Sequence, residues 1–164
     1  MSVLDPARSA TLRAALAAGP QPYIAELAKL FTALPGVTTM TILATAPDRS
    51  IVHRIGTSDA AGFPLGGFDP IDDGPWSRRI FVERLPVIGN TSAEMARYIP
   101  ETAELEAAGF GSTICVPVIV AGEVRGTVNL LGAAGVFTPD VLAAVDALLP
   151  LAALVFAFEG ISAP

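Results

Sequence analysis

The side chains with the most distinctive chemistry in this sequence are few, because it contains one tryptophan, one histidine and one cysteine. Trp76 can stack on a planar ligand, and the nearby Arg79 can pair with a carboxylate or a phosphate. His53 is a candidate haem ligand or acid–base group, but a strand histidine without a partner carboxylate is more often structural. Cys115 is expected to be a small buried hydrophobe. No spacing of these residues predicts a metal site or a nucleophile–base pair.

The elements that must position these residues follow from hydrophobic periodicity and from Gly and Pro breaks. Residues 58–74 have many glycines and no periodicity, which predicts a long loop. Helices are expected at 5–18, 22–34, 75–83, 91–99, 101–108 and 140–158, and strands at 37–45, 50–57, 85–88, 112–120 and 123–131. We expect one domain over residues 1–164, with N-terminal helices (1–35), a sheet with a helical excursion (36–137) and a C-terminal helix (138–158).

A tight hairpin is predicted where Ala121-Gly122 joins the last two strands. Because cross-strand partners share a face, pairing of Val120 with Glu123 divides the hairpin into two faces. A mixed face, suited to a small-molecule site, would carry Ser112, Ile114, Val116, Val118, Arg125, Thr127, Asn129 and Leu131. The other, which includes Cys115, would be apolar and covered by the terminal helices. A slip of one residue would exchange the two faces.

Four stretches of the sequence together resemble the GAF domain family. They are residues 80–87 (IFVERLPV), 109–118 (GFGSTICVPV), 122–131 (GEVRGTVNLL) and Phe137-Thr138 before the last helix. The resemblance covers the whole chain in element order and residues 75–158 in motif detail, as for a stand-alone single GAF domain. It implies a six-stranded antiparallel sheet with helices on one face and a roofed ligand pocket on the other. Its relatives bind cyclic nucleotides, tetrapyrroles, haem, amino acids or 2-oxo acids, or bind nothing and dimerise.

The expected fold is therefore α/β (α+β): a GAF-like or PAS-like antiparallel sheet of five to six strands with terminal helices on one face. The middle helices and loops roof a pocket on the other. Thr127 and Asn129 are the best strand contacts for a ligand, or else they bond loop backbone groups. Trp76 and Arg79 lie in the roof, Tyr98 is a candidate wall, and Phe68 and Phe63 either close over a ligand or anchor the glycine-rich loop. The predicted ligand-binding set is His53, Phe68, Trp76, Arg79, Tyr98, Ser112, Ile114, Val116, Thr127 and Asn129.

Composition excludes several classes of partner. A net charge of −6 and a single lysine do not suit nucleic acid or an anionic membrane surface. The apolar segment 141–158 is near the minimum length of a membrane span but contains Asp146 and Pro150, so we expect a helix on the sheet. The first residues lack a signal peptide's apolar core, which predicts a cytoplasmic location.

Three classes of function remain open at this stage. The first is a domain that binds a small, unidentified organic molecule in a sensory, regulatory or carrier role, with any signal passed to a separate output protein. The second is a non-catalytic interaction or dimerisation module with a filled pocket. The third is an enzyme, which is disfavoured, since the free methionine sulfoxide reductases of this family use several cysteines and this chain has one. We expect no metal or bound cofactor, and a homodimer formed through the terminal helices.

Overall fold

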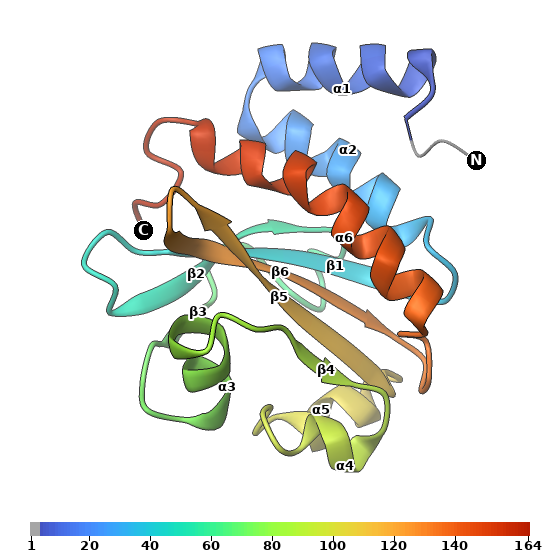
Figure 1. The fold of residues 1–164 in the computed structure, drawn as a ribbon, viewed down its shortest axis with the longest axis vertical. Helices are drawn as coiled ribbons and strands as arrows, with labels where there is room; N and C mark the ends of the chain where they lie inside the picture. The colour runs from blue at the N-terminus through green and yellow to red at the C-terminus, as the bar shows by residue number, and fades with distance from the viewer. Residues whose placement is uncertain (1–3) are drawn as a thin grey trace.

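The computed structural model describes residues 4–164 and has an antiparallel sheet at its centre. Its six strands lie in the order β3-β2-β1-β6-β5-β4 (Figure 1). The strands are β1 (Val37–Thr45), β2 (Ile51–Thr57), β3 (Phe68–Pro70), β4 (Val87–Gly89), β5 (Ser112–Val120) and β6 (Glu123–Gly132). The predicted α+β class is confirmed. The short strand β3 was not predicted; it lies within the stretch expected to be a loop and pairs with β2.

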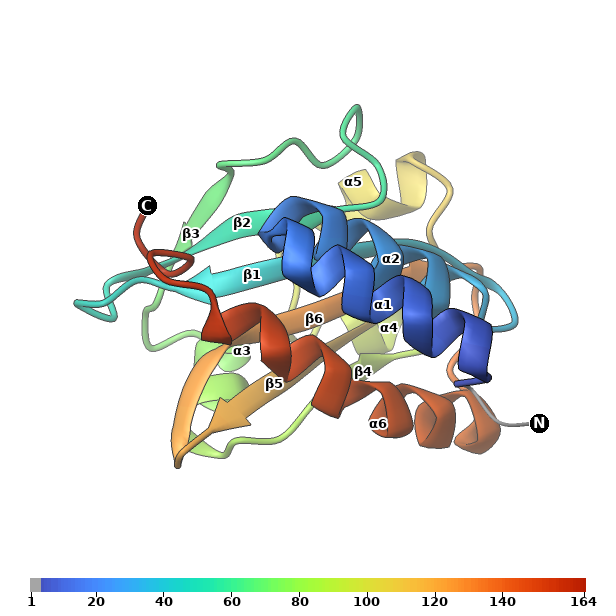
Figure 2. The same cartoon turned by 90° about the horizontal axis from the view of Figure 1, so that it is seen from above.

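The helices divide between the two faces of the sheet, as the sequence predicted. One face is covered by α2 (Pro20–Thr32) and α6 (Pro139–Ala153), and α1 (Pro6–Ala18) packs on α2 as an outer layer (Figures 1 and 2). The last helix continues as a 3-10 turn, η2 (Leu154–Ala157). On the other face lie α3 (Pro75–Ser77), its π-helical continuation η1 (Arg78–Val82), α4 (Ser92–Met95) and α5 (Thr102–Ala107).

Local sequence sets the helix ends. Asp5 and Thr138 each accept a hydrogen bond from a first-turn backbone N–H of α1 and α6, and a proline follows each as the first helical residue. Thr91 caps α4 in the same way, through the N–H of Glu94. The Glu94 carboxylate accepts the N–H of Asn90, one residue before the position that a capping box requires.

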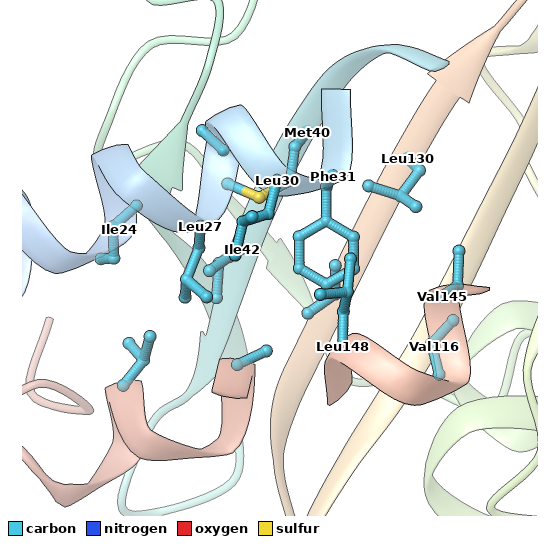
Figure 3. Close-up of a cluster of buried hydrophobic side chains, with 14 of the residues drawn as sticks. Ile24, Leu27, Leu30, Phe31, Met40, Ile42, Val116, Leu130, Val145 and Leu148 are labelled. Atoms are coloured by element: carbon cyan, nitrogen blue, oxygen red, sulfur yellow. The ribbon is translucent and has the colours of Figure 1, made fainter. Parts of the chain in front are cut away.

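The main hydrophobic core lies between the sheet and α2 and α6. Side chains from both helices interdigitate with those of β1, β5 and β6 (Figure 3). The residues labelled there are Ile24, Leu27, Leu30 and Phe31 of α2, Met40 and Ile42 of β1, Val116 of β5, Leu130 of β6, and Val145 and Leu148 of α6. A smaller cluster on the other face joins Ile80, Val87, Cys115 and Val124 beneath η1.

The β5–β6 hairpin has the predicted turn but not the predicted register beyond it. Ala121 and Gly122 both have positive φ, 53° and 81°, as a type I′ turn requires, and Val120 pairs with Glu123. The register then shifts, because Ile119 pairs with Val124 whereas Val118 pairs with Gly126. The extra residue of this β-bulge is Arg125, and beyond it the side chains of β5 face the opposite side from the one predicted.

The C-terminal helical span is the most apolar element. Pro139–Ala157 has 19 residues, a mean hydropathy of 2.0 and 33% of its residues buried, so by length and composition it is long and apolar enough to cross a membrane. In the structure one side of the span covers the sheet through Val141, Val145, Leu148 and Ala152. The opposite side is exposed and mixes small apolar residues with Asp140 and Asp146, and Leu154 is its one large exposed apolar side chain, at 40%.

Candidate functional site: a pocket on the open face of the sheet

A cavity of about 330 Å³ lies between the sheet and its roof, on the face that α2 and α6 leave uncovered. Its floor comes from β1, β2, β5 and β6, and its walls from the 58–67 loop, β3, α3 and the α4–α5 segment. The lining residues include Thr41, Leu43, Arg54, Phe63, Asp69, Asp72, Trp76, Tyr98, Ile99, Glu101, Leu105, Thr113, Cys115, Asn129 and Leu131. Its size is at the lower end of the range for small-molecule sites, and an apolar wall with a few polar groups is typical of them.

The roof above the cavity is organised by Asp72. Its Oδ1 accepts hydrogen bonds from the N–H of Gly74 at 2.8 Å and from Ser77 Oγ at 3.0 Å. These bonds hold the pKa of the Asp72 carboxyl below its usual value. The turn that they fix begins α3 and places Trp76 against the cavity, with its ring edge-to-face on Phe81 at 5.9 Å between centroids.

Arg54 is the only basic residue that lines the cavity within the described part of the chain. Its Nη1 donates to the carbonyl oxygen of Pro64 at 3.0 Å, and its guanidinium carbon lies 5.5 Å from the ring centroid of Phe63. Its Nε is buried and has no hydrogen-bond partner. Burial lowers the pKa of Arg54, and the nearby Asp69 carboxylate acts in the opposite direction. No ion pair described for residues 4–164 includes Arg54.

The loop beside Arg54 is held to β2 through both backbone groups of this residue, its N–H and its carbonyl. The Arg54 N–H donates to the Gly67 carbonyl at 2.7 Å, and the Gly66 N–H donates to the Arg54 carbonyl at 2.9 Å. A Cβ at Gly67 would lie 2.7 Å from Arg54 Nη1, so the absence of a side chain there leaves room for the guanidinium. Phe63 is anchored on Phe110, with ring centroids 5.8 Å apart. This loop therefore positions the one cationic group of the pocket.

Asn129 supplies a second polar group on the floor. Its Nδ2 donates to Thr41 Oγ1 at 3.1 Å, whereas its Oδ1 is buried without a partner. The hydroxyls of Thr45 and Thr127, on the same face of the sheet, are also buried without partners. Four of the seven unpartnered buried side-chain atoms in the described residues thus lie on this face. Of the four residues, Arg54 and Asn129 line the cavity. An unpartnered buried polar group costs roughly 1–3 kcal/mol, so a ligand that bonds either of these two would remove that cost.

Cys115 also faces the cavity, where it contacts the roof. Burial raises the pKa of its thiol to about 11, and side-chain hydrogen bonds with Trp76 and Thr113 act in the opposite direction. A thiol of this kind stays protonated at neutral pH and is a poor nucleophile. Among the described residues there is no second cysteine, and no group of His, Cys, Asp or Glu that could hold a metal ion.

Solved structures with the same architecture place this pocket in a known fold. The GAF domain of an Acinetobacter phosphoenolpyruvate-protein phosphotransferase superposes with a TM-score of 0.68 over 94% of this chain and 96% of that one, at 12% identity. The chain has the GAF domain fold. Residues 122 to 287 of a methyl-accepting chemotaxis protein match with a TM-score of 0.69, 16% identity and coverage of 92% and 94%.

A chromophore-binding domain is also similar to this chain. The chromophore-binding domain of a bacteriophytochrome from R. palustris matches with a TM-score of 0.63 and 13% identity, over 94% of this chain and 60% of that one. No family model matches the chain, and no curated protein matches it in sequence. At these identities the likeness shows the GAF fold and does not indicate a ligand.

Three of the predicted site residues meet at the cavity: Trp76, Tyr98 and Asn129. Thr127 lies on the same face but is completely buried and does not line the cavity. The prediction that Ser112, Ile114 and Val116 face the pocket is wrong. The bulge at Arg125 turns them toward the helices, where Ile114 and Val116 join the main core and the Ser112 hydroxyl donates to the Ala133 carbonyl. Cys115, predicted to face the helices, is turned toward the pocket instead.

Three other predicted residues lie away from the cavity. Arg79 donates to the Pro86 carbonyl and pairs with Glu83, so its guanidinium closes the turn after η1. His53 is buried on the helix-covered side of β2, beside Ala44. Phe68 pairs with His53 in β3, so it shares that side, and it is 67% exposed.

Sequence reasoning missed Arg54, Asp69 and Thr41. Arg54 directly follows His53 in β2, and adjacent strand residues point to opposite faces. The choice of His53 therefore selected the wrong side of the strand. The available indication was a charged residue in a run, 51–56, whose other residues are all uncharged or apolar apart from His53, since a charged group in a buried strand needs a partner.

Proposed function

We propose that this GAF-fold chain binds a small organic molecule in the pocket beneath Trp76, in a sensory, regulatory or carrier role. The observation that carries the proposal is the Asn129 amide at the cavity. Its Nδ2 donates to Thr41 Oγ1, whereas its Oδ1 is buried and has no hydrogen-bond partner. A molecule that donates to Asn129 Oδ1 would remove the cost of leaving that atom unbonded. The chemotaxis and phytochrome structures of the same fold support a sensory role by analogy.

The decisive experiment is native mass spectrometry of freshly purified protein, followed by denaturation and identification of anything released. A molecule present at one per chain supports the proposal. Adding it back at ~100 times its dissociation constant should stabilise the fold by roughly 2.7 kcal/mol. The same addition to a Trp76→Ala variant should give a smaller shift, because that variant removes the roof. Full stabilisation of the Trp76→Ala variant would contradict this location of the binding site.

A homodimer through the terminal helices is a second proposal, supported by the composition of the C-terminal helical span. Two-thirds of the residues in this apolar span are not buried in the single chain, and the large apolar side chain of Leu154 is exposed. The half-buried side chains of Leu142, Leu149 and Leu151 would be covered further by a second helix. A symmetric pairing would bury the same surface from both chains and leave the pocket accessible on the far side of the sheet. We expect such a dimer to be cytoplasmic and to act on a separate output protein.

A further inference from the structure

The arrangement of charges in the pocket narrows the class of ligand. Arg54 on β2 and Asn129 on β6 both line the cavity from the floor and are separated by β1, whereas the carboxylates of Asp69, Asp72 and Glu101 line it from exposed positions. The site thus offers one half-buried positive group beneath several exposed negative ones. A ligand that matches it must place its own acceptor deep and keep its negative charge small.

The hydrogen-bonding state of the Arg54 guanidinium indicates which acceptor group the ligand carries. Arg54 Nη1 is used by the Pro64 carbonyl, but Nε is buried and unpartnered. A guanidinium that keeps an unused N–H is suited to a carboxylate, because oxygen acceptors bond such planar donors strongly. The guanidinium is already fixed by the loop and the Phe63 ring, so little conformational entropy is lost when an anion binds.

The side chains of the cavity walls indicate the chemistry of the rest of the ligand. Phe63, Trp76 and Tyr98 line the cavity together with Leu43 and Leu131. These surfaces favour a flat or branched apolar body. The carboxylates at Asp69, Asp72 and Glu101 would repel phosphate groups, which carry more negative charge than a carboxylate.

We propose that Arg54 anchors the acid group of a small organic monocarboxylate with an apolar body, while Asn129 accepts a hydrogen bond from a donor on the same molecule. This inference rests on the proposed binding function and names its substrate class. Arg54 is then the residue that decides between acids and their neutral analogues, since an uncharged amide cannot balance the charge of the half-buried guanidinium.

Matched probes test the inference with Trp76 as the reporter, because it is the only tryptophan in the chain and lines the pocket. Four compounds share a phenyl body and differ in head group: phenylacetate, phenylacetamide, phenethylammonium and phenyl phosphate. 4-Methylpentanoate and its amide add a branched aliphatic body. Each is titrated at millimolar concentration while tryptophan fluorescence and the melting temperature are recorded. We expect a carboxylate to change both, and its amide to bind about tenfold more weakly or not at all.

Two arginine variants provide the control. Arg54→Gln should weaken carboxylate binding about 10- to 100-fold, whereas Arg13→Gln removes the same charge from an exposed position on α1 and should leave binding unchanged. Arg54→Lys keeps the charge but removes the planar Nε–H donor, so it should give an intermediate loss. This third variant provides the comparison if Arg54→Gln does not fold.

Several outcomes overturn the inference. They are preferential binding of the amide, the ammonium or the phosphate, equal binding by Arg54→Gln and wild type, and no response to any carboxylate. If a neutral or cationic molecule is released in the native mass spectrometry experiment, the monocarboxylate class is wrong but the binding function stands. If nothing is released and no probe of any charge binds, both proposals fail.

Discussion

Cys115 lies directly opposite Asn129 in the β5–β6 ladder, so the two side chains share the face of the sheet that lines the pocket. The Arg125 bulge produces this relationship; without it Cys115 would lie opposite Val128, on the helix-covered side. One inserted residue therefore brings together the unpartnered Oδ1 of Asn129 and a thiol that contacts the Trp76 roof. Bulges often redirect a side chain at a functional site, and here the bulge determines which half of β5 forms the floor.

Asn129→Leu should weaken ligand binding while changing the free energy of unfolding by less than about 1 kcal/mol. It loses one hydrogen bond to Thr41 but also removes an unpartnered buried oxygen, and these effects oppose each other. Asn90→Leu is the matched comparison. Asn90 bonds both the N–H and the carbonyl of Phe137, so its loss should destabilise the fold by about 2–3 kcal/mol. Denaturant unfolding and ligand titration of both variants distinguish the two roles; equal destabilisation would assign Asn129 to the scaffold.

The order and type of most elements could be predicted from the sequence because periodicity, caps and breaks agree with the final fold. Thr138-Pro139 before an apolar run and Ala121-Gly122 between β-rich runs are local features, and both elements form as expected. The features that were not predicted depend on how strands distant in sequence pair with one another. The strand β3 has three residues and exists because it bonds the edge of β2. The Arg125 bulge likewise has no local sequence marker.

The candidate site could be predicted only in part, for the same reason. Trp76 and Tyr98 were assigned from their positions in the roof, and such assignments do not depend on strand register. The residues of β5 did depend on it, so a shift of one position moved Ile114 and Val116 into the core. Arg54 was missed because its neighbour His53 was the rarer residue type, and alternation along a strand places only one of the two in the pocket.

Gly67→Ala tests whether the 58–67 loop positions the pocket cation. The added Cβ would lie 2.7 Å from Arg54 Nη1 and must displace the guanidinium. We expect weaker binding of carboxylate probes by severalfold, with a change in melting temperature of only a few degrees because the site is at the surface. Leu65→Ala, half exposed in the same loop, should leave binding unchanged. If both variants bind the probe as wild type does, the loop does not position Arg54.

Leu154→Glu should convert a dimer to monomers without loss of fold. The side chain is 40% exposed on the uncovered side of the C-terminal span, so a charge there is solvated in the monomer but would be buried and unpaired in the proposed interface. Ile119→Glu is the control, since Ile119 is similarly exposed but lies near the tip of the β5–β6 hairpin. Light scattering gives the mass of each variant. A dimer that survives Leu154→Glu, or dissociates equally with Ile119→Glu, would contradict an interface on the terminal helices.

The buried thiol of Cys115 predicts a loss of stability at high pH. Folding raises the pKa of Cys115 from 9.0 to about 11 because burial disfavours the thiolate. A raised pKa means that the folded state holds its proton more tightly than the unfolded chain does. The contribution of the protonated Cys115 thiol to the free energy of unfolding is therefore fully present below pH 9 and is lost as the pH rises toward 11. Its size is about 2–3 kcal/mol, from two pKa units at 1.36 kcal/mol each.

Cys115→Ala isolates this contribution. The variant should be less stable than wild type at neutral pH, because it leaves a small cavity under Trp76, but its stability should fall less steeply between pH 9 and 11. Tyr23, whose pKa burial raises to about 12, titrates in both proteins and so cancels in the comparison. Guanidinium unfolding at each pH gives the two slopes. Parallel slopes would mean that the Cys115 thiol is not shielded by the roof, and that α3 and η1 open readily enough for solvent, and a ligand, to enter beneath Trp76.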